Sequence, residues 1–177
     1  ADAYLLKLDS SGDYAWVAVF GNSQTDTAQG VAVDSSGNVY VTGYFEGTVD
    51  FDPGSGTDNH TSTGGEDVFV LKLDSSGDLV WAKSFGGSAN NDYGFSIAVD
   101  SSGNVYVAGE FHATADFDPG EGTAELTSDG GSAYALKLDS SGDYVWAKQF
   151  GVNDGATSIA VDSSGNVYTT GTFRGTG

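Results

Sequence analysis

The chain has no cysteine, no methionine and only two prolines, and its 177 residues include just six basic side chains. Without cysteine, disulfide bonds cannot hold the fold together. The six basic residues stand against 25 acidic ones, which gives a net charge of −19. This balance argues against nucleic-acid binding, which needs clustered lysine and arginine, and against anionic membrane surfaces. No apolar run approaches the ~20 residues that a membrane span requires, so we expect no membrane insertion.

Two short phrases return three times each along the chain. The first is VDSSGNVYVTG, and with at most one change it occupies residues 33–43, 99–109 and 161–171. The second is KLDSSGDYAW, and with at most two changes it occupies residues 7–16, 72–81 and 137–146. Copies of the second phrase begin 65 residues apart. One repeat unit is therefore about 65 residues long and contains two hairpins, and such self-similarity indicates a repeat architecture.

Each copy of Asp-Ser-Ser-Gly lies between two runs rich in Val, Tyr, Leu and Trp, which are typical of β-strands. The phrase predicts a hairpin turn in which a type I turn is followed by a residue with positive φ. Glycine adopts positive φ without steric cost, and it recurs at one place in the six copies: Gly12, Gly37, Gly77, Gly103, Gly142 and Gly165. The Asp side chain can accept hydrogen bonds from backbone N–H groups two residues on. Turn chemistry explains the phrase, and a cation or ligand role is the alternative.

The predicted strands carry apolar side chains on both faces. In residues 38–45, Val39 and Val41 alternate with Tyr40, and residues 67–74 alternate in the same way. Because neighbouring side chains in a strand point to opposite faces, both faces of each sheet must be covered. The sequence therefore predicts an all-β fold, a β-propeller whose ~65-residue repeats each form a four-stranded antiparallel blade. A β-solenoid is the alternative, disfavoured because solenoid repeats are usually shorter, at roughly 20–30 residues.

We expect residues 1–177 to form a single repeat domain with three blade equivalents. Its parts are the hairpin 1–21, the repeat 28–86, the repeat 94–151 and the closing hairpin 156–177. Closed propellers typically have four to eight blades, so three are too few for an unstrained ring. The repeat arithmetic therefore predicts a fragment or a protomer of a larger propeller or assembly. Its partners would be copies of the chain itself or the rest of a longer repeat array.

Residues 65–111 carry a resemblance to a known family. The matching pieces are Asp-x-Phe-Val-x-Lys-Leu, a Phe-Gly-Gly close, and Ile-Ala-Val-Asp-x-x-Gly-Asn-Val-Tyr-Val-x-Gly. This stretch resembles the SBBP repeat, a β-propeller repeat of large bacterial surface and secreted proteins, and the resemblance covers essentially the whole chain in three copies. It implies a β-propeller fold and an extracellular or cell-surface location in a bacterium. No catalytic residues come with it.

Enzyme chemistry finds little support in the residues. The two histidines, His60 and His112, fall at non-equivalent points of the repeat, and Arg174 is the only arginine. No Gly-x-Ser-x-Gly elbow surrounds a serine. Repeated aspartates in turns are far more often structural than catalytic. We therefore expect no enzymatic activity and no catalytic residues.

Metal binding is the sharper hypothesis about chemistry. Two copies of Asp-Phe-Asp-Pro-Gly place the carboxylates of Asp50 and Asp52, and of Asp116 and Asp118, on one side of an extended segment. Calcium takes six or more oxygen ligands, and loop carbonyls could complete such a set. The alternative is a strand end turned by Pro-Gly, with Asp50 or Asp116 capping backbone N–H groups. Calcium is thus the one candidate cofactor, at these four residues.

The sequence favours a non-catalytic extracellular β-propeller repeat module that acts as a structural or self-assembly scaffold, either an oligomeric ring or a surface fibre. The alternative is a module that binds carbohydrate or protein, with calcium stabilising the fold. Its ligand, a glycan for example, would bind the loops that differ between copies: 22–29, 87–94 and 152–157. The recurring tryptophans, Trp16, Trp81 and Trp146, favour packing between blades over a sugar platform.

Overall fold

A computed structural model describes residues 1–151 and 154–174, and this part of the chain forms fourteen β-strands and no helix. The strands are β1 (Ala3–Leu8), β2 (Tyr14–Phe20), β3 (Asp26–Val33), β4 (Val39–Phe45), β5 (Thr48–Asp50), β6 (Asn59–Thr61), β7 (Asp67–Leu73), β8 (Leu79–Phe85), β9 (Tyr93–Val99), β10 (Val105–Asp116), β11 (Glu125–Leu138), β12 (Tyr144–Phe150), β13 (Gly155–Val161) and β14 (Val167–Thr172). Every pair of neighbouring strands is antiparallel. The all-β prediction is confirmed.

The strands form two complete sheets and two half-sheets. The first four-stranded sheet has the order β3-β4-β7-β8, and the second has the order β9-β10-β11-β12. The strands of these two sheets coincide, to within two residues, with the expected repeats 28–86 and 94–151. The N-terminal half-sheet contains β1 and β2 alone, and the C-terminal half-sheet contains β13 and β14 alone. The small pair β5-β6 corresponds to the extended ends of β10 and β11 in the second sheet.

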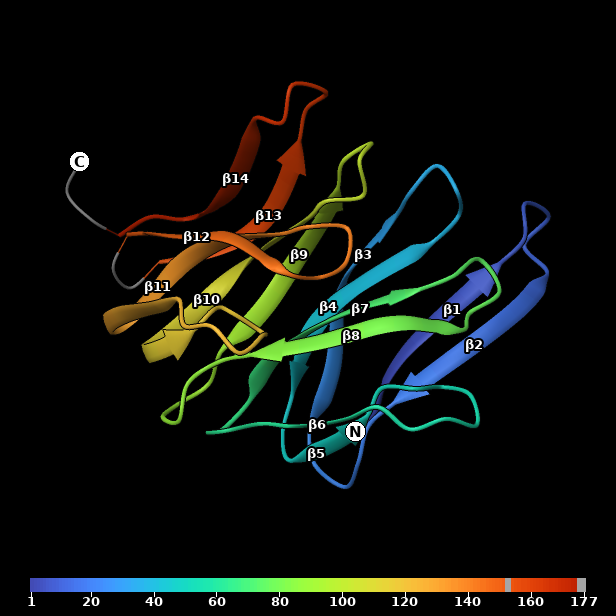
Figure 1. Cartoon of the computed structure of the whole chain (residues 1–177), viewed down its shortest axis with the longest axis horizontal. Coiled ribbons are helices and arrows are strands. Elements are labelled where there is room, and N and C mark those ends of the chain that lie inside the picture. Colours follow the sequence, from blue (N-terminus) through green and yellow to red (C-terminus); the bar gives the residue numbers. More distant parts are fainter. Residues whose placement is uncertain (152–153, 175–177) are drawn as a thin grey trace.

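The four sheets follow one another in chain order, and the two half-sheets lie at opposite ends of the molecule (Figure 1). Three apolar clusters fill the spaces between consecutive sheets. The largest joins the first and second four-stranded sheets, with side chains from β7 on one side and from β10 and β11 on the other. The stack is open within this chain, and an open stack is compatible with a segment of a propeller or of a solenoid.

The central strands of the complete sheets are covered on both faces, as the alternation of apolar residues predicts. In β4, Val39 and Val41 belong to the cluster shared with the N-terminal half-sheet, whereas Tyr40 belongs to the cluster shared with the second sheet. In β7, Phe69 and Val70 divide between the same two clusters. All five side chains are at most 6% exposed. Each complete sheet is therefore an internal layer of the stack.

The six Asp-Ser-Ser-Gly segments are hairpin turns, as predicted. Their glycines all have φ between 81° and 93°. In the turn after β3, the N–H of Gly37 donates to the carbonyl of Asp34 at 3.0 Å. Oδ1 of Asp34 accepts hydrogen bonds from the N–H groups of Ser36 and Asn38 at 2.9 and 3.0 Å. At the last turn, hydrogen bonds from the side chain and backbone of Asn166 hold the pKa of Asp162 below its ordinary value. Each Asp-Ser-Ser-Gly segment is thus a turn in which the aspartate side chain caps backbone N–H groups of the same turn.

Two expectations extend beyond the described residues. Positions 175–177 of the closing hairpin 156–177 and positions 152–153 of the loop 152–157 lie outside the part of the chain that the structure describes. Among the described residues, no helix has the length and apolar character to cross a membrane.

Candidate functional site

The N-terminal half-sheet exposes side chains that the complete sheets bury. Tyr4, Leu6 and Leu8 of β1 are 66%, 46% and 51% exposed. Their counterparts at the same positions of the repeat are fully buried, at 0% exposure: Phe69, Leu71 and Leu73 in β7, and Tyr134, Leu136 and Leu138 in β11. In the first complete sheet, Val31 of β3 pairs with Val41 and therefore faces the N-terminal half-sheet; it is 58% exposed, whereas its counterpart Ile97 in β9 is 6% exposed. The outer face of β1 and this part of β3 are thus two apolar surfaces that lack the strands covering their counterparts.

The C-terminal half-sheet shows the same contrast. Tyr168 and Phe173 are 58% and 68% exposed, although their counterparts Tyr40, Tyr106, Phe45 and Phe111 are at most 1% exposed. Within the complete sheets, a lysine of the next strand lies 5.1 Å from each buried tyrosine ring. These lysines are Lys72 and Lys137, and their counterpart in the N-terminal half-sheet is Lys7. Tyr168 therefore stands at an edge whose usual partner strand is absent.

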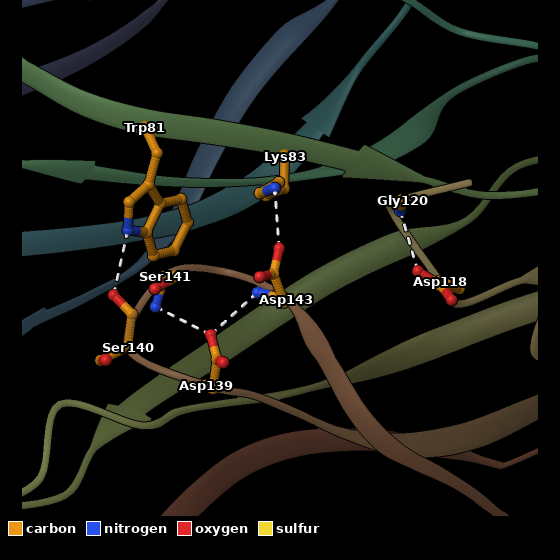
Figure 2. A network of polar contacts seen from close by, with 8 residues as sticks. All are labelled: Trp81, Lys83, Asp118, Gly120, Asp139, Ser140, Ser141 and Asp143. Atoms are coloured by element: carbon orange, nitrogen blue, oxygen red, sulfur yellow. Dashed lines mark hydrogen bonds and ion pairs between the residues drawn. The ribbon is translucent and has the colours of Figure 1, made fainter. Parts of the chain in front are cut away.

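Consecutive sheets are also joined by a contact between a tryptophan and a turn (Figure 2). Trp81 Nε1 donates to the carbonyl of Ser140 at 3.3 Å, and Lys83 Nζ lies 3.4 Å from Asp143 Oδ1. Gly142 packs on the Trp81 ring, because a β-carbon there would lie 3.2 Å from it. The contact recurs one repeat earlier, where Trp16 donates to the Ser75 carbonyl at 3.3 Å. The recurring tryptophan thus packs between sheets, as the sequence favoured.

The four candidate metal ligands lie in two equivalent loops. Oδ1 of Asp50 accepts hydrogen bonds from the N–H groups of Asp52 and Asp58 at 3.1 and 2.8 Å, and these bonds hold the pKa of Asp50 below its ordinary value. Asp116 accepts from Asp118 and Ala124 in the same way, at 3.0 and 2.8 Å.

The second carboxylate of each pair also caps the loop. Asp52 and Asp118 each accept one further bond, from the N–H groups of Gly54 and Gly120 (Figure 2). This geometry is that of backbone capping. In residues 1–151 and 154–174, no three His, Cys, Asp or Glu side chains gather as a group that could hold a metal ion. Calcium at these four residues stays a prediction.

A buried pair of carboxylates lies between the two complete sheets. Asp67 and Asp92 are 3% and 1% exposed. The position of a β-carbon on Gly86 would be 2.6 Å from Oδ1 of Asp67 and 2.9 Å from Oδ2 of Asp92, so the two groups face each other across this glycine. Asp92 accepts the N–H groups of Gly87 and His112 at 2.8 and 3.0 Å. Within the described part of the chain, Oδ1 of Asp67 has no hydrogen-bond partner.

The pair has strongly perturbed acidity. Burial, together with the charge of Asp67, raises the pKa of Asp92 to about 6. Burial also raises the pKa of Asp67 above its ordinary value. The sequence reasoning missed these residues, although one signal was present: Asp26, Asp92 and Asp154 recur at one position of the repeat, outside the turns. All three are at most 3% exposed.

The variable loop 87–94 lines an open cavity of about 260 Å³, together with His112. Its walls carry amide and aromatic side chains from Asn90, Asn91 and Tyr93. Asn91 Nδ2 donates to the Tyr93 hydroxyl at 2.9 Å, and the His112 ring nitrogen Nδ1 lies 2.8 Å from the Asn91 carbonyl oxygen. Amide groups beside an aromatic ring can bind a polar ligand that has one apolar face.

One group resembles a catalytic triad in composition but not in surroundings. Nδ1 of His60 lies 2.9 Å from the Ser84 hydroxyl, and Nε2 lies 3.5 Å from Asp58. Ser84 borders a cavity of about 210 Å³ that is also lined by Asp67, Asp116 and Asp118. Such a negative cavity would oppose the developing oxyanion of acyl transfer, which needs hydrogen-bond donors. The arrangement therefore gives no support to catalysis.

Comparison with known proteins agrees with this geometry. The family described as SBBP, beta-propeller repeat, matches residues 15–44, 80–110 and 145–172. Each match begins in the last strand of one sheet and ends in or just after the second strand of the next. An uncharacterized WD repeat-containing protein of Acanthamoeba polyphaga mimivirus is 28% identical over 190 residues. The alignment covers 90% of this chain and 13% of that protein, so the chain spans about an eighth of its relative. With three matched repeats over half of its length, the chain belongs to the SBBP beta-propeller repeat family.

Proposed function

We propose that this chain is a non-catalytic extracellular or cell-surface repeat module that acts as a self-assembly scaffold. One observation carries the proposal: positions that are at most 6% exposed in the complete sheets are 46–68% exposed in the outer layers. Large contiguous apolar patches and unpaired strand edges both drive association. The family match supports a repeat scaffold, and the assembly and the location are inferred.

The two half-sheets are complementary halves. The N-terminal half-sheet is the counterpart of β7-β8 and β11-β12, and the C-terminal half-sheet is the counterpart of β3-β4 and β9-β10. One of each makes a four-stranded sheet. Two chains joined at both ends would form a closed ring of six sheets, whereas a rotation that does not close would give a fibre. In a longer array, neighbouring repeats would cover the same two faces.

Sedimentation velocity across a wide range of chain concentrations tests the proposal. We expect a particle of at least two chains that dissociates on dilution, because association follows mass action. Leu6→Glu should weaken association, since Leu6 is already exposed in the single chain and should tolerate a charge there. Val80→Glu is the matched control, because Val80 and its counterpart Val145 are 51% and 45% exposed in complete sheets. A monomer at every concentration would overturn the proposal.

A second candidate function is ligand binding at the cavity beside the loop 87–94. Its support is the convergence of Asn90, Asn91, Tyr93 and His112 at one opening. A glycan array probed with the labelled chain tests this function. Binding that is lost in Tyr93→Ala and kept in Tyr14→Ala, an exposed tyrosine outside the cavity, would support it. No binding to any glycan would count against a carbohydrate ligand.

A further inference from the structure

We propose that copies of this chain join head to tail, with β14 of one copy paired to β1 of the next in a single defined register. This inference rests on the proposed self-assembly and specifies its interface. Each half-sheet has one edge strand, β14 or β1, whose counterpart is paired with a neighbouring strand in both complete sheets. In the first sheet the corresponding edges meet as β4-β7, and in the second as β10-β11. A second copy supplies the strand that each edge lacks.

The register follows from the two complete sheets. Val39 pairs with Leu73 in the first sheet, and Val105 pairs with Leu138 in the second. The same pairing between copies puts Val167 opposite Leu8. It then runs through Tyr168 with Lys7, Thr169 with Leu6, Thr170 with Leu5, Gly171 with Tyr4 and Thr172 with Ala3. A shift by one residue would turn every side chain of the added hairpin to the wrong face, so the register is strongly specified.

This register places each exposed apolar side chain where its counterpart is buried. Tyr168 would receive Lys7 of the second copy over its ring, as Tyr40 receives Lys72 at 5.1 Å. Leu6 and Leu8 would be covered by the second four-stranded sheet of the neighbouring copy, in the way that β11 is covered by the first sheet. The joint therefore continues the interfaces that already hold the chain together.

The turn contact between sheets supplies a second, independent match. Trp146 is the counterpart of Trp16 and Trp81, which each bind the turn of the following sheet. The next turn after Trp146 would be residues 9–13 of a second copy. Gly12 of that turn is open: among the described residues, no atom lies within 4 Å of the position of its β-carbon. Gly77 is the counterpart of Gly12, and a β-carbon there would lie 3.0 Å from the Trp16 ring.

The absence of cysteine makes the register testable by cross-linking. The chain with Thr169→Cys and Leu6→Cys carries one thiol at each end. Directly opposed residues of an antiparallel pair have Cα atoms ~4.5–5.5 Å apart, within the range that a disulfide spans. The half-sheets lie at opposite ends of one molecule (Figure 1), so a disulfide here must join two copies. Mild oxidation should convert most chains to covalent dimers or longer species on a non-reducing gel.

The matched control carries Thr169→Cys with Leu5→Cys, which places the second thiol one residue away on the opposite face. It should cross-link at least roughly fivefold less, because neighbouring side chains of a strand point to opposite faces. Equal cross-linking of the two variants, or no cross-linking of the Thr169→Cys, Leu6→Cys variant while the chain still associates, would overturn the register while self-assembly stands. A wild-type chain that stays monomeric at all concentrations would overturn both.

A charge exchange tests the turn contact by a different measurement. The salt bridge between Lys83 and Asp143 should have its counterpart between Lys148 and Asp13 of a second copy. Lys148→Glu alone and Asp13→Lys alone should each weaken association by roughly two- to fivefold, the range expected for an exposed ion pair. The double variant should recover the wild-type dissociation constant. Additive loss in the double variant would refute this contact.

Discussion

Replacing Asp67 by asparagine should stabilise the protein at neutral pH. Asp67 Oδ2 accepts the N–H and the hydroxyl of Thr63 at 2.9 and 3.1 Å, and its Oδ1 is buried beside Asp92. An asparagine can keep its oxygen on Thr63 and place its amide nitrogen where Oδ1 now stands. From there the nitrogen can donate to Asp92. The substitution therefore removes one buried charge and satisfies a buried polar position without changing the shape of the side chain.

The magnitude follows from the acidity of Asp92. A rise in its pKa from 3.8 to about 6 corresponds to about 3 kcal/mol of lost stability at pH 7. Burial of Asp92 itself is the largest cause, and it remains in the variant, so only part of this loss is recovered. A new hydrogen bond to a charged group contributes about 1.5–3 kcal/mol. We expect a net gain of about 1–2 kcal/mol, which raises Tm by roughly 2–8 °C for a chain of this size.

The sign of the pH dependence distinguishes this explanation from others. Because the folded pKa of Asp92 lies above the unfolded value, the folded state binds more protons between pH 4 and 6, and wild-type stability falls as the pH rises through that window. Other groups around the pair are the imidazole of His112, which lowers the pKa of Asp92, and the buried Tyr134, whose pKa is raised by burial and by the charge of Asp92.

Urea unfolding at pH 4.5 and 7.5, at one fixed chain concentration, measures the effect. The gain from Asp67→Asn should be larger at pH 7.5, because at pH 4.5 the wild-type pair already carries a proton. Asp78→Asn is the control: Asp78 is an exposed aspartate in the turn between β7 and β8, and its substitution should change stability by less than about 0.5 kcal/mol. A loss of stability in Asp67→Asn at pH 7.5, or a gain independent of pH, would refute the reasoning.

Two further predictions concern the turns and calcium. Gly103→Val should destabilise by more than about 1 kcal/mol in thermal unfolding, because a β-branched residue is poorly tolerated at φ 81°, and Ser102→Ala should matter much less. Gly165 has the same φ, and among the described residues no atom lies within 4 Å of the position of its β-carbon, so Gly165→Val measures backbone strain without crowding. Equal melting shifts for Gly103→Val and Ser102→Ala would contradict the turn explanation. For the calcium hypothesis, millimolar calcium should raise Tm, and the double variant Asp52→Asn, Asp118→Asn should abolish the rise; a response no different from that of sodium at equal ionic strength would refute it.

The turns and the strand faces could be predicted because local chemistry determines them. Asp-Ser-Ser-Gly encodes its own turn through a positive-φ glycine and a capping carboxylate, as the hydrogen bonds of Asp34 show. The alternation of Val39, Tyr40 and Val41 likewise decides which side chains face each neighbouring sheet. These features depend on only a few consecutive residues, and the recurrence of the same turn segment six times strengthens the prediction of a hairpin turn.

The buried carboxylates could not be predicted with the same means. Asp67 begins β7 of the first sheet and Asp92 immediately precedes β9 of the second, and they meet because Gly86 lets the two side chains approach. In an acidic chain, single aspartates outside the turns look like solvent-exposed residues. Sequence periodicity likewise gives the length of a unit but not the order of the strands within a sheet.

Assembly should itself depend on pH, through the counterpart of this acidic pair. Asp2 and Asp26 occupy the positions of Asp67 and Asp92, and both lie 2.9 Å from the position of a β-carbon on Gly21. Burial already raises the pKa of Asp26, with a contribution from the charge of Asp2. Asp2 is exposed now, but it precedes β1, and the proposed joint would cover that strand.

Covering Asp2 would leave two buried carboxylates side by side, as at Asp67 and Asp92, where the pKa of Asp92 reaches about 6. A group whose pKa rises on association takes up a proton, so association should strengthen as the pH falls from 7 to 5, by up to about tenfold per pH unit for one proton taken up at each joint. Sedimentation at pH 7, 6 and 5 measures this dependence. Asp2→Asn should strengthen association at pH 7 and flatten the pH profile, whereas Asp13→Asn, on the same hairpin but away from this pair, should leave its slope unchanged. A pH profile that is flat in the wild type, or equally steep in Asp2→Asn, would show that Asp2 is not buried in the assembly.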